Sequence, residues 1–163
     1  MWWSEARLVA LAGLAALLAG CGFHLQGALV LPEGVRTVHF AARDQLSPFA
    51  VELRRALERS GASVAGSANG ADAVIRVLQE RTGRRVLSVS ARNTPQEYEV
   101  FYMVEFAIDR AGQEALAPQR LELTRYFSFD ESLLLAKDRE EAVLREAMAR
   151  DLADLVLRRL ESL

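Results

Sequence analysis

The chain has 163 residues, with 20 Lys or Arg, 22 Asp or Glu and a formal charge of −2. Acidic and basic residues are mixed along the sequence, so no strongly basic region predicts nucleic-acid binding. The single cysteine excludes an internal disulfide, and neither histidine has a cysteine or carboxylate at metal-ligand spacing. We therefore expect no nucleic acid partner, no metal and no cofactor.

The N-terminus has the pattern of a lipoprotein signal peptide. Residues 8–18 carry no charge, which suits a signal peptide and is too short to span a bilayer. They lead into Leu18-Ala19-Gly20-Cys21, the lipobox of bacterial lipoproteins. We expect cleavage of residues 1–20 and acylation of Cys21 with N-acyl and S-diacylglycerol groups. The alternative is an ordinary signal peptide with a chance cysteine.

The residue after the anchor indicates the destination of the mature protein. Aspartate at this position retains bacterial lipoproteins in the inner membrane, and this chain has Gly22. We therefore expect localisation at the cell outer membrane. Each buried methylene of an acyl chain contributes about 0.8 kcal/mol, and two or more chains anchor a protein stably.

After the anchor, the sequence predicts a tether, a strand and a helix. Residues 21–34 are expected to form an extended tether, and residues 35–41 alternate as a short strand. Ser47 is suited to cap a helix whose first residue is Pro48. Gly61 is placed to end that helix in the left-handed conformation.

The middle of the chain predicts strands. Residues 62–72 form a loop that could include a minor strand. Residues 73–90 are interpreted as one long strand bent or bulged near Gly83, although a hairpin at Gly83 would add a fifth strand. A turn over 92–95 then leads into the clearest strand of the sequence, residues 98–109.

The C-terminal part predicts one more strand and a long helix. Leu121 to Phe129 form the strand, with Arg125 breaking its apolar row; a bulge, an acidic partner or a sheet edge would explain that arginine. Residues 137–160 have helical periodicity, with Asp138 as a candidate cap. These elements predict an α+β two-layer sandwich over residues 35–163, with a mixed four-stranded sheet and two helices on one face.

Several short stretches occur in the order found in the LptE family of lipopolysaccharide-assembly lipoproteins. Each is weak alone, but their order and spacing over nearly all of the mature chain resemble that family. They are Cys21-Gly22-Phe23-His24-Leu25; Arg92-Asn93 before Glu97-Tyr98; Arg125 with Tyr126-Phe127-Ser128-Phe129-Asp130; Ala136-Lys137-Asp138 before Glu140-Glu141; and Leu157-Arg158-Arg159-Leu160.

The resemblance implies a non-enzymatic partner of a β-barrel. In this interpretation the protein forms a one-to-one complex with the LptD barrel, plugs its lumen and assists its assembly. It also binds lipopolysaccharide for delivery to the cell surface. The protein itself is expected on the periplasmic side of the membrane and within the barrel lumen. The alternative is an auxiliary lipoprotein of another outer-membrane lipid transport system. An anchored enzyme would need a pocket with convergent titratable groups, and no motif indicates one.

The sequence suggests two groups of site residues, one from the resemblance and one from the strand pattern. Arg92 and Lys137 match basic family positions, and arginine and lysine pair with phosphate, so both are candidates for lipopolysaccharide contact. Arg84 and Arg85 are weaker additions, and all four could instead be solvated charges. The strand face away from the helices mixes acids and aromatics, which would suit a polar lumen wall, although a partly covered amphipathic face is the alternative. The candidates for contact with the barrel on this face and the adjacent strand are Glu97, Glu99, Phe101, Met103 and Tyr126.

Overall fold

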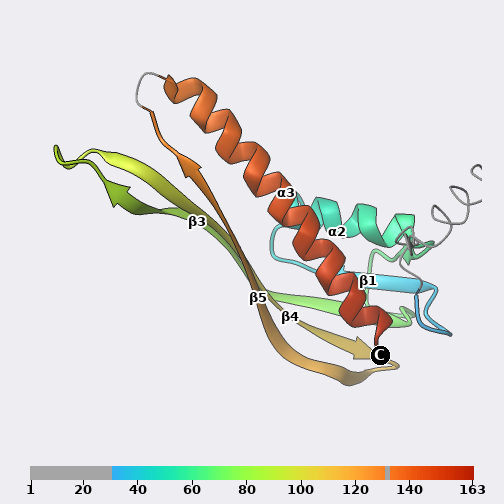
Figure 1. Ribbon diagram of the computed structural model, residues 1–163. Coiled ribbons are helices and arrows are strands. Elements are labelled where there is room, and N and C mark those ends of the chain that lie inside the picture. The colour runs from blue at the N-terminus through green and yellow to red at the C-terminus, as the bar shows by residue number, and fades with distance from the viewer. Residues whose placement is uncertain (1–30, 131–132) are drawn as a thin grey trace, which may run out of the picture.

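The computed structural model describes residues 31–130 and 133–163 (Figure 1). The expected signal peptide, Cys21 and the tether up to residue 30 lie outside the described residues. The remainder of the tether ends in a turn, in which the Val35 amide donates to the Pro32 carbonyl over 3.1 Å. The elements are β1 (Thr37–Ala41), α2 (Pro48–Arg59), β2 (Ser63–Val64), β3 (Ala73–Val89), β4 (Pro95–Arg110), β5 (Gln113–Ser128) and α3 (Leu134–Glu161).

The strands form one mixed sheet in the order β2-β1-β3-β4-β5. Strand β1 is parallel to both neighbours, and the β3–β4 and β4–β5 pairs are antiparallel. Both helices lie on the same face of the sheet (Figure 1). The predicted α+β two-layer architecture is confirmed. The fifth strand is β2, inside the predicted loop 62–72, and the alternative hairpin at Gly83 is wrong because β3 continues through that residue.

Helix α2 begins and ends where the local sequence predicts. The Ser47 hydroxyl accepts a hydrogen bond from the Ala50 amide over 3.1 Å, and Pro48 occupies the first turn, where its missing N–H costs nothing. The helix ends at Arg59, and Gly61 follows with a φ of +85°. Both predicted signals are therefore confirmed.

Helix α3 begins earlier than its apolar period predicts. Its first residue is Leu134, and Leu133 precedes it without a capping side chain. The prediction that Asp138 caps the helix is wrong, because the leucine and alanine residues before it are good helix formers and extend the helix by almost a turn. Neither helix of the described chain has the length and apolarity needed to cross a membrane.

The core lies between the helices and the adjacent face of β4. Alternate β4 side chains are fully buried, as predicted for that face: Val100, Tyr102, Val104, Phe106 and Ile108. They pack with buried residues of both helices, including Leu53 of α2 and Leu152 of α3. Arg125 of β5 lies on the same side and pairs with Asp151 of α3 over 3.1 Å, so an acidic partner explains its place in an apolar row.

Two β-bulges change the face that β3 side chains occupy. The pairing with β4 shifts between Val77 and Gln79 and again between Val86 and Ser88. Because Leu78 is the extra residue of the first bulge, the helix-facing side chains change from odd to even positions beyond it. The prediction of a bulge at Gly83 is wrong: Gly83 pairs in register with Phe101, and a Cβ there would lie 2.9 Å from the Phe101 ring. The glycine makes room for that ring.

Candidate functional site

Arg92 lies at the tip of the hairpin between β3 and β4. The turn is held by Ser90, whose amide donates to the Thr94 carbonyl over 2.8 Å and whose hydroxyl accepts from the Arg92 and Thr94 amides. Asn93 adopts a φ of +59°, which asparagine tolerates better than most residues. Arg92 is exposed, and its guanidinium has no ion pair with any described residue. A rigid turn therefore presents a free cation.

Lys137 lies in the first turns of α3, toward the same end of the sheet. Strand β5 ends opposite the start of β4, which places the beginning of α3 on the side of the molecule where the β3–β4 hairpin projects (Figure 1). Lys137 pairs with Glu140 over 2.8 Å, and its side chain is only 15% exposed. This lysine is therefore less available than Arg92 and would have to exchange its partner to bind an anion.

The guanidinium of Arg84 is already paired with other residues of the protein. Its guanidinium pairs with Glu141 of α3 over 2.8 Å and lies 4.9 Å from the centre of the Tyr98 ring. Glu141 is buried and also pairs with Arg145. Arg84 thus fastens the start of α3 to β3, a role that sequence reasoning did not predict.

Arg85 is held on the opposite face of the sheet. It pairs with Glu122 over 2.9 Å and with Glu99 over 3.5 Å, and it covers the Phe101 ring at 4.5 Å. Arg120 also pairs with Glu122, and the two arginines hold the pKa of that carboxyl below its ordinary value, with Arg120 the larger cause. Neither Arg84 nor Arg85 is free to bind phosphate in the structure.

The sheet face away from the helices presents four of the five predicted barrel-contact residues. Glu97 accepts from the Ser88 hydroxyl over 2.7 Å, Glu99 and Phe101 contact Arg85, and Tyr126 is 61% exposed. The fifth, Met103, differs from the prediction: only 1% of its surface is exposed, so it offers no contact surface.

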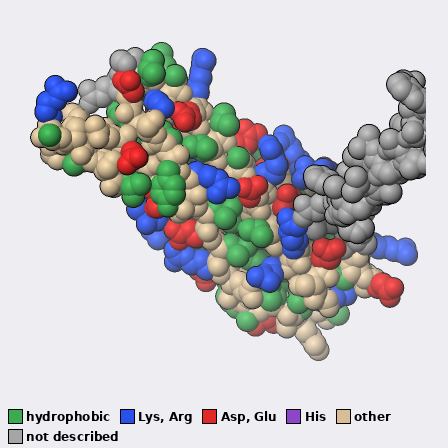
Figure 2. Space-filling view, viewed as in Figure 1, with side chains coloured by type: hydrophobic (Ala, Val, Ile, Leu, Met, Phe, Trp, Pro, Cys, Tyr) green, Lys and Arg blue, Asp and Glu red, His purple; other side chains and the backbone are tan. Residues whose placement is uncertain are grey.

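Sequence reasoning missed an exposed apolar region at the end of the molecule that holds Arg92. Figure 2 shows hydrophobic side chains beside charged ones at the end where the hairpin projects in Figure 1. The second β3 bulge lies at this end, and the leucine run at the start of α3 was the visible sequence signal. The exposed members are Val86, Leu87, Val89, Tyr126, Leu133, Leu134 and Leu135.

The described residues contain no candidate metal site. No group of three histidine, cysteine or acidic side chains is close enough to hold a metal within the described chain. A small hollow beside the start of α3 is lined by Arg84, Arg145, Asp138 and Glu141, but Arg84 and Arg145 share the Glu141 carboxylate. These charges act as structural pairs.

Comparison with known proteins identifies the family. The model of the LptE family, described as lipopolysaccharide-assembly, matches residues 35–160. The chain belongs to the LptE family. The match includes every strand, α2 and all of α3 except its last residue, so the candidate residues Arg92 and Lys137 both lie inside the family region.

Named relatives of this LptE-family chain agree with the match. The LPS-assembly lipoprotein LptE of Pectobacterium atrosepticum is 28% identical over 150 residues, covering 91% of this chain and 81% of the relative. The protein of the same name from Yersinia enterocolitica is 26% identical over 155 residues, covering 94% of this chain and 74% of the relative.

Solved structures extend the agreement to three dimensions. The rare lipoprotein B of Shewanella oneidensis superposes with a TM-score of 0.69 at 28% identity, covering 78% of this chain and 95% of that one. The uncharacterized lipoprotein B of Nitrosomonas europaea gives a TM-score of 0.72 at 28% identity, covering 86% and 91%. The LptE-family fold therefore has a sheet with two helices in these relatives as well.

Proposed function

We propose that this LptE-family chain is an outer-membrane lipoprotein that plugs an LptD-type β-barrel, supports its assembly and binds lipopolysaccharide for delivery to the cell surface. The lipid on Cys21 would hold the protein at the periplasmic side, and the folded domain would enter the barrel lumen. The proposal rests on family membership and on the properties of two surfaces. It contains no covalent step.

The observation that carries lipopolysaccharide binding is the free cation at the hairpin tip. A phosphate needs a donor that is not already paired, and Arg92 meets this requirement whereas Arg84 and Arg85 do not. The Ser90 hydrogen bonds fix the backbone beneath Arg92, which lowers the entropy lost on binding. The exposed leucines at the start of α3 would suit the acyl part of the same molecule.

The open sheet face supports the proposed position inside a barrel. A lumen wall is polar, so a protein within it needs a charged but ordered surface. Arg85, Glu99, Glu122 and Arg120 form a chain of ion pairs across three strands of this face. Such a face can exchange hydrogen bonds with a polar wall without leaving an isolated buried charge.

The double variant Arg92→Glu with Lys137→Glu tests lipopolysaccharide binding. Each reversal removes one charge-assisted contact and adds repulsion from phosphate, so we expect the affinity for labelled lipopolysaccharide to fall roughly tenfold to a hundredfold. Barrel association should remain, because neither residue lies on the open sheet face. Binding is measured with the full-length protein in detergent.

A charge-matched control uses arginines at the other end of α3. Arg158 and Arg159 are exposed near the C-terminus, and reversing both changes the net charge by the same amount as the test variant. This control should bind lipopolysaccharide nearly as the native protein does. Equal losses in both variants would indicate a general charge effect, and unchanged binding in the test variant would return Arg92 and Lys137 to ordinary solvated charges.

A further inference from the structure

Strand β3 has a long open edge. Strand β1 pairs with β3 only from Ala73 to Arg76, after which the chain leaves the sheet to form α2. From Val77 onward, β3 is paired with β4 alone, and no backbone hydrogen bond from any other described segment reaches it. The unpaired amides and carbonyls of such an edge can bind another extended chain.

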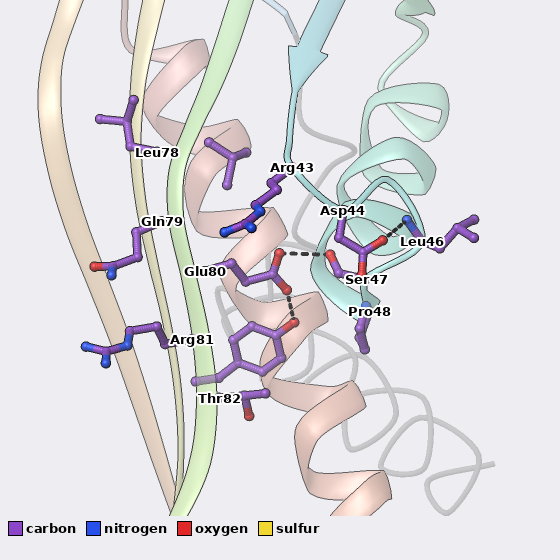
Figure 3. Close-up of a pocket in the computed structure, with 12 residues that line it drawn as sticks. Arg43, Asp44, Leu46, Ser47, Pro48, Leu78, Gln79, Glu80, Arg81 and Thr82 are labelled. Atoms are coloured by element: carbon purple, nitrogen blue, oxygen red, sulfur yellow. Dashed lines mark hydrogen bonds between the residues drawn. The ribbon is translucent and has the colours of Figure 1, made fainter.

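A hollow of the described structure lies where this edge begins. Its volume is about 820 Å³, and its walls are β3 from Val77 to Thr82, the loop after β1 and the start of α2 (Figure 3). Glu80 of β3 connects two of these walls, because its carboxylate accepts hydrogen bonds from Ser47, which precedes α2, and from Tyr102 of β4. Leu46 and Leu78 border the hollow with exposed side chains. It is therefore a preformed groove beside a strand edge.

The two bulges of β3 lie at the two ends of this edge, and the segment between them is regular. Proteins often protect edge strands with bulges and charges, and both features occur on β3. From Gln79 to Val86, however, the pairing with β4 runs without a shift, so this segment keeps regular strand geometry. It is long enough to pair with a short strand laid along it.

The charges of β3 indicate what such a strand would contain. Arg76, Arg84 and Arg85 all have acidic partners, whereas Arg81 has no ion pair with any described residue. Figure 3 shows Arg81 and Gln79 on the side of β3 away from Glu80. An acidic side chain on an added strand would lie directly beside Arg81 on this open face.

Gly83 indicates a second side chain that an added strand would carry on the same face. It is two residues from Arg81, so both lie on one side of the strand. The Phe101 ring leans over Gly83 so closely that a Cβ there would lie 2.9 Å from it. An apolar side chain on an added strand opposite Gly83 could reach the edge of this ring.

We propose that the β3 edge from Gln79 to Val86 is a strand-addition site for an extended segment of a protein partner. That segment carries an acidic residue opposite Arg81 and an apolar residue two positions away, opposite Gly83. The site does not depend on lipopolysaccharide binding at Arg92, so failure of either proposal leaves the other in place.

Hydrogen exchange of the full-length protein in detergent tests the site. The probe is a short blocked peptide of threonine and valine that contains one glutamate followed two residues later by leucine. We expect at least tenfold slower exchange for amides between Gln79 and Val86 when the peptide is bound. The outer edge of β5 is the internal control, because it is also unpaired in the sheet. No slowing at β3, or equal slowing at β5, would overturn the proposal.

A charge exchange tests the recognition of Arg81. Because Arg81 is exposed, Arg81→Glu should fold normally, which circular dichroism can verify. We expect the variant to bind the glutamate peptide roughly fivefold more weakly and a lysine-for-glutamate peptide roughly fivefold more tightly than the native protein does. If the substitution changes the affinity of both peptides by the same factor, Arg81 does not select the acidic residue and the assigned partner chemistry is wrong.

Discussion

Tyr102→Phe should lower the free energy of unfolding by about 2–3 kcal/mol. The Tyr102 hydroxyl is buried, accepts a hydrogen bond from the Phe49 amide over 3.2 Å and donates to Glu80. Phenylalanine fills the same space, but it leaves a buried amide in the first turn of α2 without an acceptor. Urea unfolding followed by circular dichroism measures the loss.

Tyr126→Phe is the matched control for this substitution. Tyr126 is 61% exposed, and water can replace any hydrogen bond its hydroxyl makes, so its loss should change stability by less than about 0.5 kcal/mol. If Tyr102→Phe were as stable as Tyr126→Phe, the connection from Glu80 through Tyr102 to α2 would not contribute to the fold.

The Tyr102→Phe substitution should also change how the free energy of unfolding depends on alkaline pH. Burial, together with the Glu80 carboxylate, raises the pKa of Tyr102 far above its ordinary value of 10.0. Above about pH 10 the unfolded tyrosine loses its proton while the native one keeps it, so native stability falls by about 1.4 kcal/mol per pH unit through this group. Tyr102→Phe lacks this contribution, and the stability difference from the native protein should narrow above pH 10.

Cys21→Ala should move the protein from the membrane to the soluble periplasmic fraction when the barrel partner is depleted. The proposed acyl chains are its membrane anchor, and several chains of buried methylene groups bind far more strongly than one. Alanine cannot form the thioether, so release should be nearly complete. Fractionation of the envelope with immunoblotting provides the measurement.

Gly22→Ala is the control for this experiment, because it leaves the lipobox cysteine in place. It should remain in the membrane fraction at the native level. Quantitative recovery of Cys21→Ala in outer membranes that lack the barrel would contradict lipid anchoring through that residue.

The elements of the fold could be predicted where the signals are local. Ser47, Pro48 and Gly61 act on adjacent backbone groups, so α2 has the predicted ends. The alternation of β4 predicts its buried face because one strand face meets both helices. The start of α3 was missed because the residue before Leu134 is Leu133, which provides no capping side chain.

The details of β3 could not be predicted because they depend on pairing between strands. A bulge arises from the alignment of two strands, and the sequence of β3 alone does not give that alignment. Gly83 suggested an irregular strand, but its role is to accommodate Phe101 of the neighbouring strand. The actual bulges lie beside Leu78 and Leu87, which have no distinguishing local sequence.

The pairing of the candidate site residues could not be predicted, for the same reason. Sequence reasoning selected the basic residues by resemblance but could not separate free arginines from paired ones. The partners of Arg84 and Arg85 are 57 and 37 residues away, in α3 and β5. Only the folded chain shows that Arg92 is the one of these three arginines without such a partner.

Purification of the affinity-tagged lipoprotein from its native outer membrane tests the central proposal most directly. We predict that a large LptD-type barrel co-purifies with it in a one-to-one ratio, because the proposed role is that of a plug inside the barrel. Recovery of the lipoprotein alone, or with a different lipid transporter, would contradict the proposed place of this LptE-family protein in lipopolysaccharide delivery.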